Sequence, residues 1–382
     1  MKKKTSHVRA NSAPALPVAD VMQFEPLARK RLSQMAYDYI RSGGADEITM
    51  RENRLGFERL ALSPRVLVDV SEINTRVSLL GFELDSPILL APIAYQRLFH
   101  PEGELATARG ANAAGAIFVV STFATTPIRE IAKNTSQPIW FQLYAQRDRA
   151  FTRNMVERAV AEGCKALCLT VDTPVLGCRY GQIKFAPPPG IDCPQLHGLA
   201  ETLKIASRQT RGSGIYDLLS NPTFTWRDVE WLRSFANVPL VLKGVMNPDD
   251  AVRAVDAGVD GIIVSNHGGR NLDMLPAAIE ALPRVVDAVG GRIPVLMDSG
   301  IRRGTDILAA LALGARAVLV GRPYVYGLAA GGAEGVERVI RILREELERA
   351  MALTGRRSIA EIDSSVLWRK ETTLASTQSA SR

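Results

Sequence analysis

Short apolar runs recur along the chain and alternate with segments of helical pattern. The runs lie near residues 88–92, 116–121, 139–144, 166–171, 238–243, 261–265, 293–298 and 316–320. A short apolar run bounded by turn residues is typical of a strand that is buried on both faces of a parallel sheet. Eight such strands alternating with helices predict an α/β fold of the (β/α)8 TIM-barrel type rather than an open doubly wound sheet.

Glycine and capping residues mark the ends of the predicted helices. Helical patterns end two or three residues before an apolar run at Gly115, Gly163, Gly258 and Gly314. A glycine at this place is typical of the C′ position of a helix that leads into a strand. Helix starts are indicated at Thr126-Pro127, at Asn247-Pro248 and at Thr225 with Asp228. The last helix is expected over about residues 334–353.

The segment before the first strand lies outside this alternation. Residues 20–87 contain a helical pattern that ends near Gly43-Gly44, and they are expected to cap the bottom of the barrel or to reach over its rim. We predict a single domain over residues 20–365. A disordered basic tail (1–19) would precede it, and a C-terminal tail (366–382) would follow it.

A second long segment separates the fourth and fifth strands. It runs from Thr173 to Asn237, much longer than an ordinary crossover. Pro187-Pro188-Pro189-Gly190 and Gly212-Ser213-Gly214 argue against one continuous helix here. A loop of this length at the C-terminal mouth of a barrel predicts a lid or binding loop over about residues 180–225.

Composition and charge exclude several classes of protein. Of the 382 residues 46% are hydrophobic, and no uncharged apolar run is long enough to span a bilayer. The net charge is +7, but Lys2, Lys3, Lys4 and Arg9 contribute +4 of it before residue 20. Because this tail lacks interleaved aromatic residues, we expect it to be solvated and predict no nucleic-acid or membrane partner. Residues 6–17 supply no apolar signal region, so a cytoplasmic location is expected.

The four cysteines indicate neither a disulfide framework nor a metal site. They are Cys164, Cys168, Cys178 and Cys193. Cys168 lies within an apolar run, which favours core filling over metal binding. We therefore predict no metal, and a reducing compartment fits this cysteine usage.

Polar residues follow nearly every predicted strand, at the end where barrel enzymes carry their chemistry. Ser299-Gly300 and Gly321, with Arg302 and Arg322 close behind, have the position and composition of a barrel phosphate site, although glycine also occurs in ordinary turns. His267 precedes two glycines and Arg270, which would place a base beside an anion clamp. A lone histidine is more often a satisfied polar residue, but this context favours catalysis.

These residues resemble the family of FMN-dependent α-hydroxy acid oxidases and dehydrogenases, which includes glycolate, lactate and mandelate oxidases. The resemblance covers roughly Phe24 to Ile362. It rests on the strings His100-Pro101-Glu102-Gly103-Glu104, Phe141-Gln142-Leu143-Tyr144, Leu169-Thr170-Val171-Asp172-Thr173-Pro174, Lys243-Gly244, Ser265-Asn266-His267-Gly268-Gly269-Arg270 and Asp298-Ser299-Gly300-Ile301-Arg302-Arg303-Gly304.

The resemblance implies FMN as the cofactor. The ring and ribityl chain would contact Pro92, Ile93, Ala94, Ser121, Gln142, Thr170, Lys243, Ser265 and Asp298. The phosphate would lie against Ser299, Gly300, Ile301, Arg302, Gly321 and Arg322. The chain has no dinucleotide Gly-x-Gly-x-x-Gly turn, which favours FMN over FAD.

The resemblance also assigns the substrate side of the site. Arg179 and Arg270 would clamp the carboxylate of a 2-hydroxy acid, with Tyr39 and Tyr144 as hydroxyl partners. His267 would act as the base, and Asp172 would orient it. The implied reaction is oxidation of an (S)-2-hydroxy acid to the 2-oxo acid, with O2 as electron acceptor and H2O2 as product. A homotetramer is also implied.

Four positions depart from the family pattern. Asn271 replaces a longer glutamine, so a hydrogen bond behind the site is expected to be lost, and Ser299 replaces a glycine. Tyr95 and Phe123 replace the methionine and tryptophan of glycolate oxidase, and with Leu176 they are expected to border the substrate's side chain. An aromatic-lined slot of this kind predicts a lactate-like substrate first and a mandelate-like one second.

Three other readings of the sequence stay open. A mandelate or hydroxymandelate oxidase, or a quinone-linked 2-hydroxy acid dehydrogenase, would use the same site. An aldolase of the same barrel fold would instead form a Schiff base on Lys243. A non-catalytic flavin-binding protein is the third reading, but it would not need the histidine, the arginines and both tyrosines.

Overall fold

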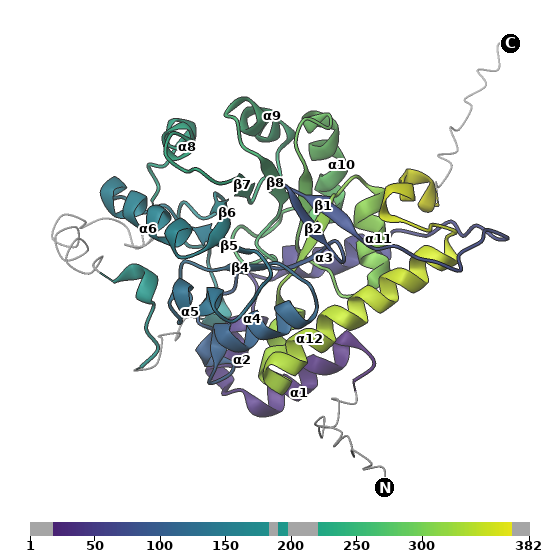
Figure 1. Cartoon of the computed structure of the whole chain (residues 1–382), viewed down its shortest axis with the longest axis horizontal. Helices are drawn as coiled ribbons and strands as arrows, with labels where there is room; N and C mark the ends of the chain where they lie inside the picture. The colour runs from purple at the N-terminus through teal and green to yellow at the C-terminus, as the bar shows by residue number, and fades with distance from the viewer. Residues whose placement is uncertain (1–17, 183–189, 198–220, 369–382) are drawn as a thin grey trace, which may run out of the picture.

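The computed structural model describes residues 18–182, 190–197 and 221–368. At its centre eight parallel strands form a closed barrel in the order β10-β3-β4-β5-β6-β7-β8-β9 (Figure 1). The strands are β3 (Ile88–Leu90), β4 (Phe118–Val120), β5 (Ile139–Leu143), β6 (Cys164–Thr170), β7 (Leu240–Lys243), β8 (Gly261–Val264), β9 (Val295–Met297) and β10 (Ala317–Val320). Each predicted run holds most or all of one strand, so the predicted (β/α)8 barrel is confirmed.

Helices surround the barrel, one after each of its strands (Figure 1). They are α4 (Gly103–Ala113), α5 (Ile128–Ala132), α6 (Arg149–Ala161), α8 (Trp226–Arg233), α9 (Pro248–Asp256), α10 (Ala278–Val289), α11 (Gly304–Ala312) and α12 (Arg322–Leu353). The predicted junction glycines have positive φ, as Gly314 between α11 and β10 shows with +97°. A Cβ on Gly314 would lie 2.6 Å from Val286 Cγ1, so both conformation and space require glycine.

Two of the three predicted helix starts are confirmed. Asn247 accepts a hydrogen bond from Asp249 N at the start of α9, and Thr225 forms a capping box with Asp228 at α8. The prediction at Thr126 was wrong, because Pro127 itself is the N-cap residue of α5. The Thr126 hydroxyl donates instead to the buried carboxylate of Glu104, 3.0 Å away.

The residues before β3 cover both ends of the barrel. Helices α1 (Phe24–Arg31) and α2 (Gln34–Arg41) precede the glycine pair, as predicted, and α2 brings Tyr39 to the carboxyl ends of the strands. Helix α3 (Ile48–Glu58) was not predicted and packs against α10. At the other end a hairpin of β1 (Val77–Leu79) and β2 (Phe82–Leu84) packs on the interior side chains of the barrel.

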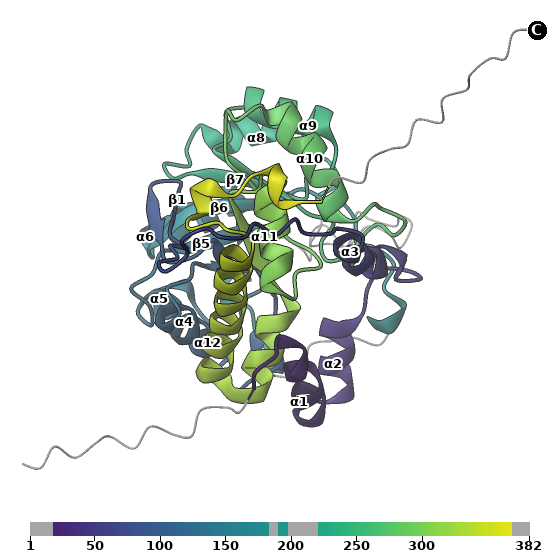
Figure 2. The same ribbon diagram turned by 90° about the vertical axis from the view of Figure 1, so that its right-hand side faces the viewer.

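Helix α12 is longer than predicted. It spans Arg322–Leu353 and bends at Gly331 and Gly332, whose backbone angles are not helical. The predicted helix over 334–353 is its second limb. The first limb is buried along most of its length and presents no polar face, so it carries no amphipathic pattern. Figure 2 shows α12 running beside α11, with α1 near its lower end.

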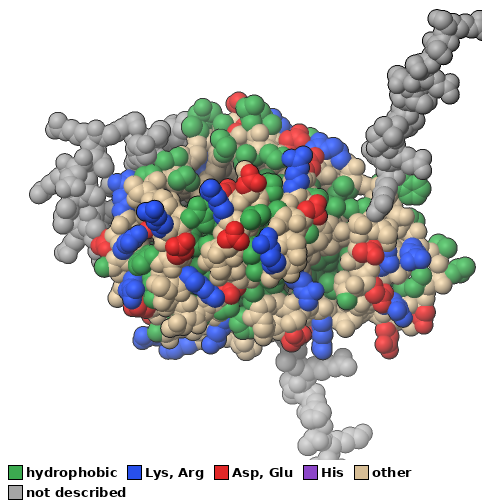
Figure 3. Space-filling model, turned by 90° about the horizontal axis from the view of Figure 1, so that it is seen from above, with side chains coloured by type: hydrophobic (Ala, Val, Ile, Leu, Met, Phe, Trp, Pro, Cys, Tyr) green, Lys and Arg blue, Asp and Glu red, His purple; other side chains and the backbone are tan. Residues whose placement is uncertain are grey.

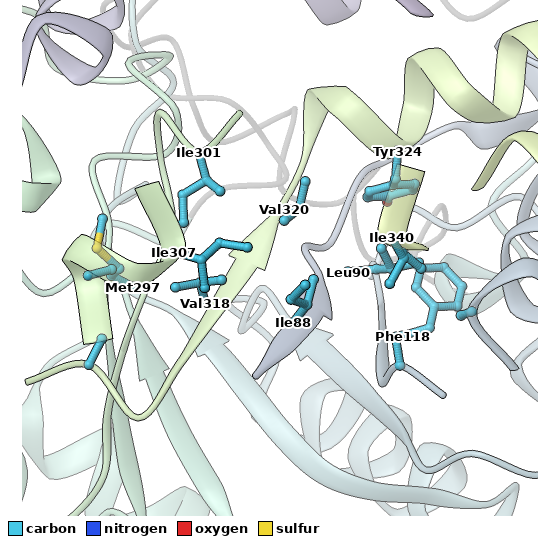
Figure 4. Close-up of a cluster of buried hydrophobic side chains, with 14 of the residues drawn as sticks. Ile88, Leu90, Phe118, Met297, Ile301, Ile307, Val318, Val320, Tyr324 and Ile340 are labelled. Carbon is cyan, nitrogen blue, oxygen red and sulfur yellow. The ribbon is translucent and has the colours of Figure 1, made fainter. Parts of the chain in front are cut away.

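The main core lies between the barrel and its helices. In Figure 4, Ile88 and Val318 from the strands lie among helix residues such as Ile307 and Tyr324. Val18 and Val366 are also buried, so the packed core begins and ends slightly outside the predicted limits of 20 and 365.

The segment between β6 and β7 is described in part. It contains short 3-10 helices at Tyr180–Gln182 and Pro194–Leu196, and then α8. Pro187-Pro188-Pro189 and Gly212-Ser213-Gly214 lie outside the described residues. The lid over 180–225 therefore stays a prediction.

The described surface mixes both signs of charge, as Figure 3 shows for the face seen from above. None of the described helices is long and apolar enough to cross a membrane. Cys164 and Cys168 are buried in β6, which confirms that they fill the core. In the ranges that the structure covers, no group of three or more His, Cys, Asp or Glu could hold a metal ion.

Candidate active site

A cavity of about 940 Å³ opens at the carboxyl ends of the barrel strands. All of the predicted site residues line it except Asp172 and Ser265, which bond to lining residues from behind. The structure thus brings together side chains from α2, all eight barrel strands or the loops that follow them, and the loop that carries Arg179. Their shared location is observed, and their individual roles stay predictions.

His267 and Asp172 form a pair at one wall of this cavity. His267 Nδ1 lies 2.9 Å from Asp172 Oδ1, so the imidazole proton on Nδ1 is donated to the carboxylate and Nε2 is left as a base. Burial lowers the pKa of His267 below its ordinary value, against the opposing effect of Asp172. Burial would raise the pKa of Asp172, but at the acid pH where this carboxyl titrates the imidazole is protonated, and its charge and hydrogen bond outweigh burial and hold that pKa low. The pair is therefore a neutral base supported by an ionised carboxylate.

Tyr144 lies beside the free nitrogen of this base. Its hydroxyl is 3.5 Å from His267 Nε2, and burial raises its pKa to about 12. The phenol stays protonated at neutral pH and can donate a hydrogen bond to a substrate oxygen next to the base.

Two arginines supply positive charge next to the base. Arg270 donates from Nη1 to the carbonyl oxygens of Tyr39 and Ser42, and Arg179 donates from Nε to the carbonyl of Arg270. Burial and the charges of Arg179 and Arg322 lower the pKa of Arg270 to about 9. In the described part of the chain neither Arg179 nor Arg270 forms a salt bridge with a carboxylate. A half-buried guanidinium pair without a carboxylate partner in the described ranges is a built site for an anion.

Four aromatic rings form a continuous wall of the cavity. Ring centroids lie 5.9 Å apart for Tyr39 and Tyr95, 5.8 Å for Tyr95 and Phe123, and 5.7 Å for Phe123 and Tyr144. Leu176 also lines the cavity but is 48% exposed, so it lies near the mouth. The rings give this side of the cavity an apolar surface against which a small side chain can pack.

The floor of the cavity carries a buried ion pair. Lys243 Nζ lies 3.0 Å from Asp298 Oδ2 and donates to Ser265 Oγ at 2.9 Å. Burial opposes the charge of Lys243, but the carboxylates of Asp298 and Asp172 outweigh burial and raise its pKa above the ordinary value. This side chain is thus a fixed cation and not a neutral amine.

A row of buried polar side chains crosses the same floor. Ser121 Oγ donates to Gln142 Oε1, and Gln142 Nε2 donates to Thr170 Oγ1 at 3.0 Å. Such a row can bond the polar edge of a planar heterocycle.

The far end of the cavity fits a phosphate group. Arg302 and Arg322 are half-buried there, and desolvation lowers the pKa of both, to about 10 for Arg302. No carboxylate of the described ranges forms a salt bridge with either of them, and the N-terminus of α12 begins at Arg322. Two uncompensated guanidinium groups at a helix N-terminus suit a dianion. With the fixed cation and the polar row, the residues present fit FMN.

Two further polar residues behind the cavity were misjudged or missed. The bond expected to be lost at Asn271 is present: its amide donates to Asp172 O and Thr173 Oγ1, and its oxygen accepts from Arg179 Nη2. The shorter side chain of Asn271 reaches these partners because the loop that carries Asn271 lies close to Asp172 and Thr173. Glu104, which was not predicted as a site residue, accepts from the backbone N–H groups of Gln96 and Thr125 beside Tyr95 and Phe123. The string containing Glu104 matched the family, which was the available signal.

The cavity also extends beyond the predicted residues. Asn221, Phe224, Trp226, Val229, Val245 and Asp250 line an extension toward the starts of α8 and α9. The Thr225–Asp228 capping signal located this helix start in the sequence, but nothing in the sequence showed that it faces the cavity.

Comparison with known proteins identifies relatives over most of the chain. The family model described as FMN-dependent dehydrogenase matches residues 28–369. The chain is 51% identical over 357 residues to an L-lactate oxidase of Nostoc sp., covering 91% of this chain and 97% of that protein. It is 46% identical over 352 residues to glycolate oxidase 1 of Oryza sativa subsp. indica, covering 90% and 94%.

Solved structures show the same similarity in three dimensions. A mandelate oxidase with (S)-2-phenylpropionate superposes with a TM-score of 0.83 at 39% identity, covering 92% of this chain and 98% of that chain. A mutant of an active chimera of (S)-mandelate dehydrogenase gives a TM-score of 0.86 at 36% identity, with coverage of 92% and 99%.

Proposed function

Because the chain belongs to the FMN-dependent dehydrogenase family of 2-hydroxy acid oxidases, we propose that it oxidises an (S)-2-hydroxy acid of lactate size to the 2-oxo acid. The observation that carries this proposal is the neutral base of His267 facing two arginines that have no carboxylate partner in the described ranges. Bound FMN supplies the two-electron acceptor, and O2 is the expected oxidant that regenerates it with release of H2O2.

The protein's own residues bind and deprotonate the substrate. Arg179 and Arg270 hold the carboxylate, and Tyr39 and Tyr144 donate hydrogen bonds to substrate oxygens. His267 Nε2 accepts the proton that the hydroxy acid loses, and Asp172 stabilises the imidazolium that results. The aromatic wall excludes water from the reacting carbon.

Lys243 supports flavin chemistry and not a Schiff base. A Schiff-base lysine must be a neutral amine, whereas the ion pair with Asp298 keeps this side chain protonated. Its charge instead suits the negative charge that a flavin ring gains on reduction. This argues against the aldolase reading.

The proposal is tested by the colour of the purified protein. The protein is expected to be yellow and to bleach when L-lactate is added without oxygen, with formation of the 2-oxo acid. A panel of L-lactate, glycolate and (S)-mandelate ranks the substrates, and a peroxidase-coupled assay detects H2O2 on readmission of air. If no 2-hydroxy acid bleaches the flavin, the proposed reaction is wrong, and if bleaching occurs without H2O2, the acceptor is another oxidant such as a quinone.

The pH dependence follows from the lowered pKa of His267. The neutral imidazole is the reactive form, so kcat/KM is expected to be level above about pH 6.5 and to fall below it as the buried ring becomes protonated. Stability changes in the same sense: the contribution of neutral His267 is present above the ordinary histidine pKa and is lost as pH falls through the lowered one. Steady-state assays between pH 5 and 9 check this, and an acid limb that begins well above pH 7 would contradict it.

The aromatic wall predicts the substrate preference. Tyr95→Ala removes a ring from the middle of the wall, so it should raise kcat/KM for (S)-mandelate relative to L-lactate by about 10- to 200-fold, the range for small misfits in apolar pockets. Tyr95→Phe keeps the ring and should leave the ratio nearly unchanged. An unchanged ratio in the alanine variant would mean that Tyr95 does not limit the pocket.

Location and assembly remain proposals. We propose a cytoplasmic homotetramer, supported by the cysteines, all four of which are free thiols, and by the family resemblance. Light scattering of the purified holoenzyme would measure the assembly.

A further inference from the structure

Gly268, the residue after the base, is fixed at both of its backbone polar groups. Its N–H donates to Ser299 Oγ at 3.0 Å, and its carbonyl accepts from Arg322 Nη1 at 2.9 Å. The Ser299 hydroxyl donates in turn to Asp298 Oδ1 at 2.7 Å. The hydroxyl therefore uses its proton and a lone pair at once, and Ser299 is only 9% exposed.

These bonds belong to a closed ring. Asp298 Oδ2 pairs with Lys243 Nζ, which donates to Ser265 Oγ, and the N–H of His267 donates to the same Ser265 oxygen at 3.0 Å. The ring thus ties two successive backbone N–H groups, those of His267 and Gly268, to one buried ion pair. Ser265 and Ser299 are the two hydroxyls that make the connection.

Two members of this ring have a backbone conformation that L-residues rarely adopt. His267 has φ of +59° and Ser299 has φ of +77°. A side chain is unfavourable at such a φ, and the resemblance placed glycine at position 299. The serine therefore costs backbone stability, and what it adds is the hydroxyl that bonds Gly268 and Asp298.

We propose that the Ser299 hydroxyl is a positioning group for the base: by holding Gly268 N–H it keeps the left-handed turn at His267 and aims Nε2 into the cavity. This inference rests on the proposed function, because it assumes that His267 is the base. It assigns to the side chain of Ser299 a role separate from the phosphate contact that the resemblance implies for this residue.

Two variants separate the hydroxyl from the backbone conformation. Ser299→Ala removes the hydroxyl and keeps the strained Cβ, whereas Ser299→Gly removes the hydroxyl and relieves the strain. Both are expected to lower kcat by about 10- to 100-fold, the scale of a small misplacement of a catalytic group, with KM little changed because Arg179 and Arg270 are untouched. Ser299→Gly should do so with an unchanged or higher Tm.

The bond between Ser299 and Gly268 can also be tested by a measurement that needs no reaction. In hydrogen–deuterium exchange of the apoprotein and of the holoenzyme, amides over 266–270 should exchange faster in both variants, while those of α11 should not. Ser86→Ala is the matched control, because it removes a buried hydroxyl that has no hydrogen-bond partner within the described residues. It should change neither exchange nor rate.

Each other outcome overturns the proposal. A Ser299→Gly enzyme with full kcat would show that the hydroxyl is dispensable, as would unchanged exchange over 266–270. A raised FMN dissociation constant with an unchanged reduction rate of the loaded enzyme would assign the hydroxyl to cofactor binding. If no 2-hydroxy acid reduces the flavin of the parent protein, the proposed function fails. The exchange experiment then still decides whether the Ser299 hydroxyl holds the turn at His267.

Discussion

His267→Ala is expected to slow reduction of the bound flavin by L-lactate about 10²- to 10⁴-fold, the usual contribution of a positioned base, and to leave the flavin bound. The base is neutral and Asp172 is ionised, so alanine removes both the proton acceptor and the imidazolium that the carboxylate stabilises. The guanidinium groups at the far end of the cavity, which would hold the phosphate, are unaffected. Anaerobic stopped-flow measures the reduction rate, and the visible absorption of the purified variant reports the bound flavin.

Two control variants accompany His267→Ala: one removes a histidine outside the site, and the other keeps the imidazole of His267 but changes its partner. His197 is exposed and paired with Asp192, so His197→Ala should reduce at the parent rate. Asp172→Asn keeps His267 but replaces an acceptor with an amide, which disfavours the productive tautomer and should slow reduction by a similar order. Reduction of His267→Ala at the parent rate would remove the histidine from the mechanism.

The barrel could be predicted because its signals are local. Each strand is a short apolar run, and four of the strands follow a glycine whose positive φ requires it, as at Gly314. The features that were missed lack a local signal. The first limb of α12 is buried on most sides. Helix α3 begins after Glu47, which has a left-handed backbone and makes no side-chain capping hydrogen bond, so no capping pattern marks the start of this helix.

The site could be predicted as a set of residues but not as a set of bonds. The strings around Asp172, His267 and Asp298 identified which side chains converge, because strand ends meet at one rim. The bonds at Asn271 could not be inferred, since its partner Arg179 is 92 positions away on another loop. The bond from Gly268 N to Ser299 depends likewise on the approach of two separate strand ends.

The same geometry explains why the substrate is harder to infer than the reaction. In the proposed reaction the base and the arginines bind groups that every 2-hydroxy acid shares. Tyr95 and Phe123 would contact only the variable side chain, and their positions depend on loops that Glu104 fixes through backbone N–H groups. Similarity to both a lactate oxidase and mandelate oxidases agrees with this division.

Arg270→Lys is expected to make binding of the substrate carboxylate strongly dependent on pH. The cavity lowers the pKa of Arg270 to about 9 from an ordinary value of 12.5, through burial and through the charges of Arg179 and Arg322. A lysine has an ordinary pKa of about 10.4, and the same burial and neighbouring charges would lower the pKa of its ammonium group below that value. The variant would therefore lose its charge at a lower pH than an ordinary lysine does, and it would be charged to a greater extent at pH 6 than at pH 8.5.

Loss of one partner of a buried charge pair costs about 2–5 kcal/mol, which is roughly 30- to several-thousand-fold in affinity. Arg270→Lys should approach this loss as the pH rises, with weaker binding at pH 8.5 than at pH 6, and its ammonium group cannot reproduce the guanidinium fork at either pH. Binding of 2-hydroxyisobutyrate, which has no hydrogen on its Cα and is not oxidised, separates affinity from the titration of His267. Arg270→Met should bind it weakly at both pH values, whereas the parent should bind it tightly at both. If the lysine variant binds equally well at pH 6 and pH 8.5, or the methionine variant matches the parent, Arg270 is not the group that holds the carboxylate.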